Sequence, residues 1–143
     1  MNHPERVVSD YNDILSIMEG CEELSLALMD GDYPYVIEMN FGFEDLNGTP
    51  VIYLHGANTG KKLDLIRANS HAAFSMSRAH SLMPGKVPCA TKFLYESVIG
   101  QGNIEIVEDV EEKCHALTVL MRHYDKQQEH AFDARHAACH SGA

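Results

Sequence analysis

This chain has no tryptophan and few basic residues, with 11 lysines and arginines against 21 aspartates and glutamates. The formal net charge of −10 excludes a general nucleic-acid surface, because phosphates would be repelled unless basic residues were concentrated in one place. No stretch approaches the roughly 18 apolar residues of a membrane-spanning helix, and the start lacks the basic-then-apolar order of a secretory signal. We therefore expect a cytoplasmic protein that binds neither nucleic acid nor membrane.

Cysteine and metal motifs are equally sparse. The 4 cysteines form no CxxC pair, so reduced structural thiols are expected, with a disulfide or a metal site as the alternatives. The 9 histidines form no HExxH motif, and no metal site is predicted. Histidines of the last third lie in a polar helical stretch and tail and are expected to be mostly solvated: His115, His123, His130, His136 and His140. The cysteines are Cys21, Cys89, Cys114 and Cys139.

A length of 143 residues suits a single domain, residues 1–143, with one sizeable core. Hydrophobic periodicity predicts three helices, over residues 10–19, 61–69 and 109 to about 128, and Thr59 is a candidate cap for the second. Strands are predicted over residues 24–29, 35–41, 51–54, 72–77 and 92–107. Residues 40–50 are expected to end one strand, form a hairpin loop and begin the next, and the proline-interrupted residues 78–91 are expected to be irregular.

The strand and helix pattern points to a mainly β protein with helices, of the α+β class. Gly100 and Gly102 are expected to bend or bulge the last strand. Short, glycine-bent strands with two or three helices are compatible with a barrel and with a sheet covered by helices. Periodicity alone leaves both arrangements open.

The most informative segment is VIYLHGANTGKKLDLIRAN, at Val51–Asn69. An apolar strand leads into His55, a loop over residues 56–60, then Lys61 and Lys62 at the start of a helix. Glycines let backbone N–H groups approach a ligand, and the helix dipole adds to the two lysines in stabilising a phosphate. The segment contains neither GxxxxGK[ST] nor GxGxxG, so a solvated helix start is the alternative.

Four blocks of the sequence resemble the FMN-binding split barrels of the pyridoxamine 5'-phosphate oxidase-like type, specifically the 5-nitroimidazole reductase (Nim) family. The blocks are PYVIEMNFGFED at Pro34–Asp45, IYLHGANTGKKLDLIRAN at Ile52–Asn69, AAFSM at Ala72–Met76 and SVIGQGNIEIVEDVEEKCHALTVLMRHY at Ser97–Tyr124. Their order and spacing agree with that family. The resemblance implies an antiparallel split β-barrel that forms a homodimer and binds FMN in clefts at the subunit interface.

The resemblance also implies which residues contact the flavin. They are Met39, Asn40 and Phe41 along the isoalloxazine ring, His55 near its edge, Gly56, Ala57 and Asn58 along the ribityl chain, Lys61 and Lys62 on the phosphate, and Ser97 and Val98 from the other subunit.

Several of these residues have a second interpretation. His55 acts as a proton donor to the acceptor, as a polar wall beside the ring, or as a histidine satisfied at a strand end. Asn40 contacts the ring or bonds only to neighbouring backbone. Met39 and Phe41 are suitable platforms for a planar ring, and apolar residues at such positions are equally suited to the core.

Related chains continue after the last helix into a further strand near a Gly-Lys pair, and here that final strand is expected to be missing or shortened, which leaves an open barrel edge. The predicted function is FMN-dependent reduction of a small acceptor, such as a nitroaromatic, with electrons from a nicotinamide or another donor. One alternative is a flavin- or haem-binding dimer that stores, senses or carries its cofactor without catalysis. Another is a structural dimer with no cofactor.

Overall fold

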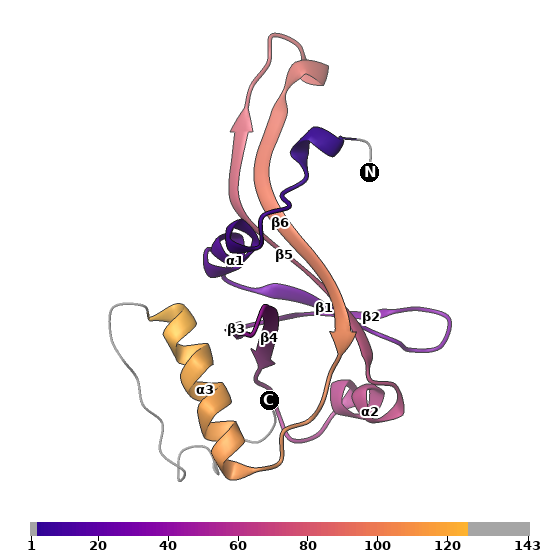
Figure 1. Ribbon diagram of the computed structural model, residues 1–143. Helices are drawn as coiled ribbons and strands as arrows, with labels where there is room; N and C mark the ends of the chain where they lie inside the picture. Colours follow the sequence, from indigo (N-terminus) through magenta and orange to yellow (C-terminus); the bar gives the residue numbers. More distant parts are fainter. Residues whose placement is uncertain (1–2, 126–143) are drawn as a thin grey trace.

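The helices and strands of this protein are seen in a computed structural model that describes residues 3–125 (Figure 1). The helices are α1 (Tyr11–Glu19), α2 (Lys61–Ala68) and α3 (Val110–Tyr124), with short 3₁₀ helices η1 (Pro4–Arg6) and η2 (Pro88–Ala90). The strands are β1 (Leu24–Leu28), β2 (Tyr35–Met39), β3 (Phe41–Leu46), β4 (Thr49–Leu54), β5 (His71–Met83) and β6 (Lys92–Asn103). All three predicted helices are present.

The strands form two antiparallel sheets, so the predicted α+β class is confirmed. One sheet has the strand order β2-β1-β5-β6, and β3 pairs with β4 in the other. Among the described residues β4 and β6 are therefore edge strands. A groove of about 460 Å³ lies between them, lined mostly by apolar side chains of β4 and of the neighbouring ends of β5 and β6.

The helix ends follow from capping groups. Asp10 precedes α1, and its carboxylate accepts hydrogen bonds from the N–H groups of Asn12 and Asp13, so the helix begins at Tyr11. The prediction that Thr59 caps α2 is wrong. Gly60 is the cap residue, with φ of 129°, and its side-chain-free backbone makes a turn that other residues rarely adopt.

The segment between β2 and β4 differs in part from its prediction. Residues 35–41 do not form one strand, because the chain breaks at Asn40 and Phe41 begins β3. Residues 40–50 match their prediction, because β3 ends at Leu46, a hairpin turn follows and β4 begins at Thr49. The turn between β3 and β4 is only two residues long. Asn47 and Gly48 have positive φ, 55° and 84°, which is the conformation that the tightest hairpin turns require.

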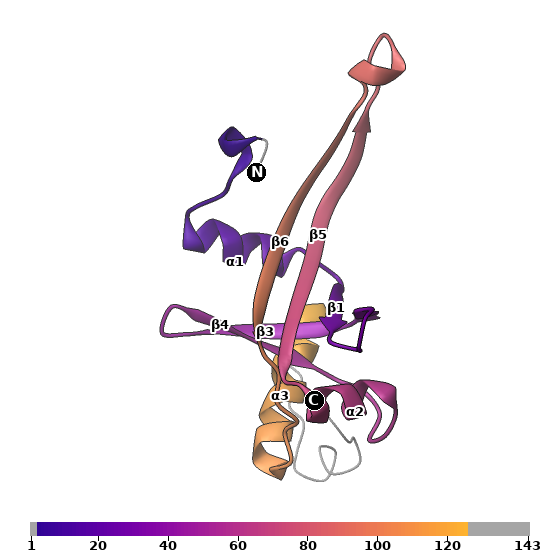
Figure 2. The ribbon, with the colours of Figure 1, turned by 90° about the vertical axis from the view of Figure 1, so that its right-hand side faces the viewer.

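The β5–β6 hairpin also corrects the prediction. The strand expected over residues 72–77 continues to Met83, so residues 78–91 are irregular only beyond that point, and β6 ends at Asn103 rather than Val107. The bulge lies in β5, between Arg78 and Ser81, where Ala79 has φ of 57°, and not at Gly100 or Gly102. The outer part of this hairpin, residues 78–97, projects from the body and is called the arm below (Figures 1 and 2).

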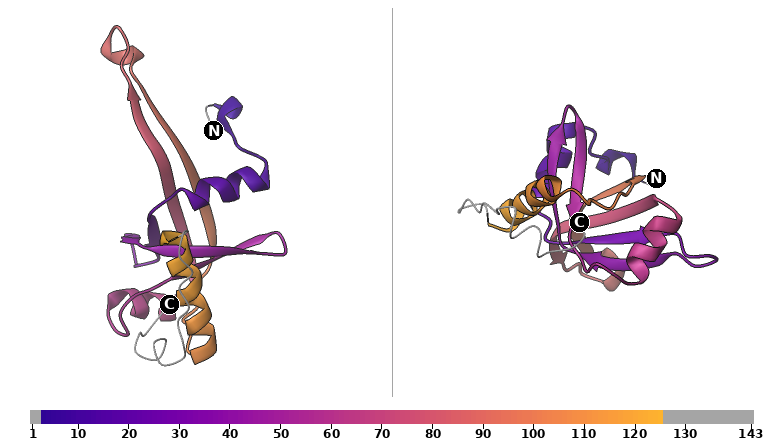
Figure 3. Two further views of the ribbon diagram at one scale, coloured as in Figure 1. Left: turned by 90° about the vertical axis from the view of Figure 1, so that its left-hand side faces the viewer. Right: turned by 90° about the horizontal axis from the view of Figure 1, so that it is seen from below.

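The core lies between α1, α2 and the four-stranded sheet, and α3 packs separately against β3. The buried residues of the core include Ile17 and Met18 of α1, Leu24, Leu26 and Leu28 of β1, and Leu63 and Ile66 of α2. The backbones of α3 and β3 are in close approach, because a Cβ atom at Gly42 would lie 2.5 Å from Cα of Leu120. Figure 3 shows α2 and α3 at the end of the molecule opposite the arm tip. None of the helices in the described part of the chain has the length and apolar character needed to cross a membrane.

Candidate functional site

A depression forms where the ends of β2 and β4 meet the start of α2. It is lined by Leu26, Met39, Leu54, His55, Gly56, Ala57, Lys62, Leu63, Ile66 and Ile104. Five of the residues predicted to hold a flavin are therefore gathered at one place: Met39, His55, Gly56, Ala57 and Lys62. The volume of the depression is about 10 Å³, which is roughly the space of one water molecule.

Lys62 and Gly56 form the polar end of this depression. The ammonium of Lys62 lies directly over the loop backbone, because a Cβ atom added at Gly56 would come within 2.4 Å of Nζ of Lys62. Glycine at position 56 thus leaves the space that the ammonium occupies. The first turn of α2 follows, and no side chain of the described residues caps its N–H groups. This end of the depression can bind an anion.

Lys61 points away from Lys62. Its Nζ atom lies 2.9 Å from the Asp30 carboxylate and 4.9 Å from the centre of the Tyr35 ring. The hydrogen bond to Asp30, and then the charge of that carboxylate, raise the pKa of Lys61. Within this chain, Lys61 therefore joins α2 to the turn between β1 and β2, and the structure does not bring the two lysines onto one ligand.

His55 and Met39 form the apolar and aromatic end. His55 follows the last residue of β4, is half-buried, and has its Nδ1 atom out of contact with solvent. The Met39 side chain is 8 % exposed and lies at the end of β2. A half-buried imidazole beside an apolar wall can contact the edge of a planar group and exchange a proton with a neighbouring molecule. Asn58, in the loop between them and α2, is exposed.

Phe41 occupies the core and not the surface of the depression. Its side chain has 0 % exposure, and its ring centre lies 4.4 Å from that of His123 in α3. Of the two interpretations of Phe41, core packing is the one observed. The neighbouring Asn40 is exposed, and its Nδ2 atom donates a hydrogen bond of 3.3 Å to the hydroxyl of Tyr124. Asn40 is thus held by α3.

Two side chains at the end of α3 make hydrogen bonds to the start of β3 and to the segment before β1. The Tyr124 hydroxyl accepts a hydrogen bond from the N–H of Phe41 at 3.0 Å and donates one to the carbonyl of Glu22. His123 is buried, and its Nε2 atom lies 2.6 Å from the carbonyl oxygen of Cys21. The expectation that His123 is solvated is therefore wrong. His115 is exposed, as expected, yet it pairs with Glu44 at 2.8 Å. His130, His136 and His140 lie outside the described residues.

Ser97 and Val98 lie away from the depression, on β6. Ser97 is exposed and pairs with Ser77 of β5. Val98 packs against the core cluster. Neither lines the depression within this chain, so their predicted place at the flavin of a partner subunit stays a prediction.

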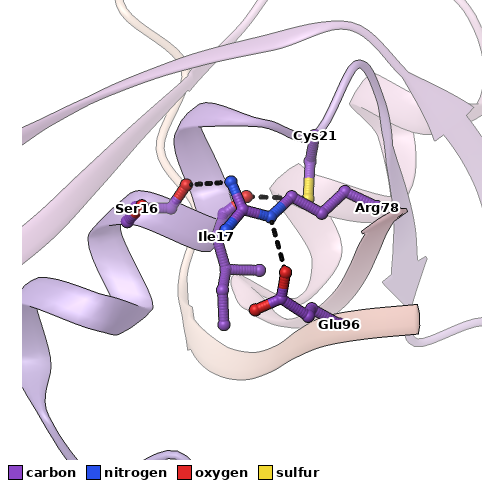
Figure 4. A network of polar contacts seen from close by, with 5 residues as sticks. All are labelled: Ser16, Ile17, Cys21, Arg78 and Glu96. Atoms are coloured by element: carbon purple, nitrogen blue, oxygen red, sulfur yellow. Dashed lines mark hydrogen bonds and ion pairs between the residues drawn. The ribbon is translucent and has the colours of Figure 1, made fainter. Parts of the chain in front are cut away.

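Arg78 anchors the arm to the body (Figure 4). Its Nη1 atom donates a hydrogen bond of 2.6 Å to the carbonyl of Ser16, and its Nε atom lies 3.2 Å from the carboxylate of Glu96. The neighbouring Cys21 thiol donates to the carbonyl of Ile17 at 3.2 Å. Burial raises the pKa of the Cys21 thiol, so it is a weak nucleophile.

The cysteines were expected to be reduced thiols, and the structure describes two more of them besides Cys21. Cys89 and Cys114 are not joined by a disulfide, and Cys139 lies outside the described residues. Among the residues that the structure describes, no three His, Cys, Asp or Glu side chains gather as metal ligands.

Sequence reasoning did not find the structural roles of Tyr124 and Arg78. Tyr124 lies in the last predicted helix, and nothing local in the sequence shows that its hydroxyl reaches residues 22 and 41. Arg78 lies in a segment that was expected to be irregular. The available signal was the His-Tyr pair at the end of an amphipathic helix. The Tyr hydroxyl and the His ring nitrogens need hydrogen-bond partners when these side chains pack against the body.

Comparisons with known proteins agree with the arrangement of these elements. The sequence profile of the family described as Pyridoxamine 5'-phosphate oxidase matches residues 11–139. A crystal structure of a proposed 5-nitroimidazole antibiotic resistance protein from Bacteroides thetaiotaomicron is similar, with 31% identity, a TM-score of 0.77, and coverage of 95% of this chain and 78% of that one. No protein with a curated description matches the chain.

Two more distant structures share the fold. An FAD and heme binding protein from Mycobacterium smegmatis has 15% identity and a TM-score of 0.74, with coverage of 94% of this chain and 65% of that one. A flavocytochrome from Azotobacter vinelandii has 14% identity and a TM-score of 0.68, with coverage of 93% and 61%. This chain spans less than two-thirds of either protein.

Proposed function

Because this chain belongs to the pyridoxamine 5'-phosphate oxidase family, we propose that it binds FMN and reduces a small acceptor with electrons from a nicotinamide or another donor. The observation that carries the proposal is the depression in which Met39, His55, Gly56 and Lys62 come together. The similar protein from Bacteroides thetaiotaomicron, a proposed 5-nitroimidazole resistance protein, makes a nitroaromatic compound the acceptor to test first.

The polar end of the depression suits the phosphate of FMN. A phosphate needs a positive charge and several N–H donors at short range. Lys62 supplies the charge, and the missing side chain of Gly56 leaves its ammonium in contact with the loop backbone. The first turn of α2 begins beside it, with N–H groups that no side chain of the described residues caps. We therefore assign the phosphate to Lys62, and we assign Lys61 to fixing the start of α2 through Asp30.

The apolar end of the depression suits one face of a flavin ring. Met39 and Leu54 form the wall, and His55 lies at its end. A depression of about 10 Å³ cannot enclose a tricyclic ring, because ligand sites of that kind have volumes of several hundred Å³. This subunit supplies one wall of the site, and we propose that a second subunit of a split-barrel homodimer supplies the other. Ser97 and Val98 are the residues predicted to come from that partner; of the two, Ser97 is exposed, whereas Val98 packs against the core of its own subunit.

The residues of the chain have separate tasks in this proposal. FMN supplies the electron transfer when it is bound. Lys62 neutralises the phosphate, Met39 orients the ring, and the apolar wall excludes water from it. His55 gives a proton to the acceptor in this proposal, since an imidazole N–H at the end of the wall can donate to a neighbouring molecule. Asn40 positions the end of β2 through Tyr124, and Phe41 supports the wall from the core.

An absorption spectrum tests the proposal. The purified protein is measured before and after excess FMN is added and free ligand is removed. About one flavin retained per subunit, followed by NADH-dependent reduction of a nitroimidazole, supports the enzyme. Retained flavin without turnover supports the alternative of a flavin-carrying or sensing dimer, and a Soret band supports a haem-binding one. A protein that retains no chromophore contradicts the proposal and leaves a structural dimer.

The two lysines give a sharper test, because they are adjacent in sequence and differ in position. Lys62→Ala should weaken FMN binding by roughly 1.5–3 kcal/mol, the value of a hydrogen bond to a charged group. Lys61→Ala should leave the FMN affinity nearly unchanged, because it removes an exposed ion pair outside the depression. Both affinities can be measured by quenching of FMN fluorescence. Equal losses in the two variants would show that both ammonium groups hold the phosphate.

A further inference from the structure

A second hollow adjoins the candidate flavin site. The groove of about 460 Å³ between β4 and β6 shares Leu26, Leu54 and Ile104 with the depression that contains His55. All three belong to the core or pack against it, so they form a fixed wall that is common to both hollows. A molecule that lies in the groove can therefore extend into contact with the depression. The proposed reaction as described above makes no use of this groove.

The groove has room because two facing residues of β5 and β6 are small. Ala72 pairs with Gly102, so both are on the same face of the sheet, and Ala72 packs against the core. A Cβ atom added at Gly102 would meet no heavy atom of the described residues within 4 Å, its chain neighbours aside. One added at Gly100 would lie 2.4 Å from the Phe74 ring. The Phe74 ring therefore bounds the space, and Gly102 leaves it open.

The chemistry of the groove suits an uncharged apolar molecule. Its volume is within the range of small-molecule sites, which are mostly apolar and have a few polar groups. Among the described residues that line it, only the exposed Glu105 is charged at neutral pH. The Tyr53 hydroxyl is already bound to Glu44. An anion would be repelled by Glu105 and by a chain of formal net charge −10, and the groove offers a cation a single exposed carboxylate.

We propose that this groove binds the apolar part of the acceptor. The preferred acceptor is then a small uncharged molecule with two parts. An apolar ring or chain lies between β4 and β6, and a reducible group reaches the depression beside His55. The inference rests on the proposed function, because that function places the reaction at the depression. It adds a substrate class, since acceptors with an apolar extension are favoured over compact or charged ones.

Binding to the groove is tested first without any acceptor chemistry. N-phenyl-1-naphthylamine is an uncharged fluorophore that brightens in apolar surroundings, so its titration with the full chain gives a dissociation constant. Gly102→Leu places a side chain in the groove and should raise that constant at least about tenfold. Gly102→Ala fills less space and should have a smaller effect. The matched control is Asn12→Leu, which adds the same side chain at an exposed position of α1 and should leave the constant unchanged.

The link between the groove and the acceptor is tested by turnover of two nitroimidazoles that differ only by an uncharged phenylalkyl chain. In the wild-type protein the chain should lower KM at least about tenfold with little change in kcat, because binding remote from the reaction acts on the ground state and the transition state alike. The measured quantity is the ratio of the two KM values. Gly102→Leu should bring this ratio to within about twofold of one, and Asn12→Leu should keep the wild-type ratio.

Several results would overturn the inference. Probe binding that Gly102→Leu does not weaken places the probe elsewhere. A wild-type chain that binds no probe shows a groove that is closed in solution, as it would be with a polypeptide segment in it. Equal KM values for the two nitroimidazoles in the wild-type protein separate the groove from the acceptor.

The proposed function is judged separately. If Gly102→Leu abolishes probe binding but the wild-type protein reduces no nitroimidazole, the groove stands as a site for apolar molecules and the proposed enzyme is contradicted. Circular dichroism of each variant must match that of the wild-type protein. Gly102→Val replaces Gly102→Leu if the latter does not fold, because β-branched side chains are favoured in strands.

Discussion

The hydroxyl of Tyr124 is a single polar group that holds three parts of the chain. It contacts the side chain of Asn40, the N–H of Phe41 and the carbonyl of Glu22. The first two lie directly after Met39, the residue proposed to support the flavin ring. Tyr124 thus sets the position of a wall of the depression without lining it itself.

Tyr124→Phe is expected to lower the free energy of unfolding by about 0.5–1.5 kcal/mol, because the N–H of Phe41 and the carbonyl of Glu22 lose their partner without any change in ring volume, at a side chain that is 40% exposed. Chemical denaturation monitored by circular dichroism measures the effect. Tyr33→Phe is the matched control, since Tyr33 is 82% exposed and its change should be within about 0.5 kcal/mol of zero. If the two variants are equally stable, the hydroxyl contributes nothing.

His55 permits a test that separates chemistry from binding. If its imidazole serves the acceptor, His55→Ala should lower kcat for nitroimidazole reduction at least about tenfold, within the range for general acid catalysis, with little change in bound flavin. Stopped-flow turnover and the flavin-to-protein absorbance ratio give the two quantities. A parallel fall of both would instead make His55 a support of the cofactor site.

At this scale the sequence predicted which residues lie together better than the directions of their side chains. Five of the predicted residues meet in one depression. Lys61 and Lys62 nevertheless separate, because neighbouring residues of a helix project about 100° apart, and only the tertiary structure decides which one faces the loop. Phe41 fitted both a ring platform and the core, and only the position of α3 distinguishes these roles.

Among the elements, the β3–β4 hairpin and α3 are joined by a cluster of titratable groups. The Tyr53 hydroxyl donates to the Glu44 carboxylate at 2.6 Å, and Nε2 of His115 lies 2.8 Å from the same oxygen. Burial, followed by the hydrogen bond and charge of Glu44, raises the pKa of Tyr53 to about 12. Burial alone would raise the pKa of Glu44, but the hydrogen bonds from Tyr53 and His115 and the nearby positive charge of His115 and Arg122 lower it. Glu112 adds a further negative charge near Tyr53.

These pKa directions predict two limbs in the pH dependence of stability. The folded state holds the Tyr53 proton more tightly than the unfolded state, so stability is lost as pH rises from about 10 toward 12. The folded state holds the Glu44 proton less tightly, so stability is lost as pH falls below about 4.5. Tyr53→Phe should flatten the alkaline limb and make the acid limb shallower, each by about 1 kcal/mol or less because these groups are partly exposed.

Thermal unfolding between pH 3 and 12 measures both limbs, and His115→Gln provides the comparison. That variant keeps Tyr53, so its alkaline limb should resemble wild type. An unchanged alkaline limb in Tyr53→Phe would exclude the Tyr53–Glu44 contact as its origin.

Helices and strands were predictable from the sequence where one face of the segment is buried. The three helices and the body strands have clear apolar periodicity, because their patterns report a core on one side. In the arm, the β6 half was predicted as a strand but residues 78–83 of β5 were not, because the bulge between Arg78 and Ser81 interrupts their alternation. The break at Asn40 was not predicted, since the alternation from Ile37 to Phe41 continues across the point where the chain changes sheets.

For the whole molecule, a site with only one wall in each subunit links cofactor binding to association. If the second wall comes from a partner, the dimer binds FMN and the monomer does not, so dilution below the dimer dissociation constant should release flavin. The apparent FMN affinity should fall at least about tenfold as the protein is diluted through that range. Fluorescence of released FMN, compared with sedimentation at the same concentrations, measures this. An affinity that stays constant through dissociation would place the whole site in one subunit.

A single sequence is least informative about the partners that the whole molecule binds. The resemblance to a family carries the expectation of a homodimer and of FMN. Glu38, Ser25, Ser75 and Ile99 belong to segments far apart in the sequence, and only the strand register places them on one face. A pattern of that kind has no local signature.

The contacts at the end of α3 also have a consequence for the order in which the protein can be made. Tyr124 meets residues that precede it by 83 and 102 positions, and His123 meets Cys21 across a similar span. While synthesis proceeds from the N-terminus, the β2–β3 junction therefore waits for almost the entire described chain before it is fixed. Contacts this distant are costly to close and slow to form. A nascent chain should acquire the β3–β4 hairpin early and the completed wall of the site last.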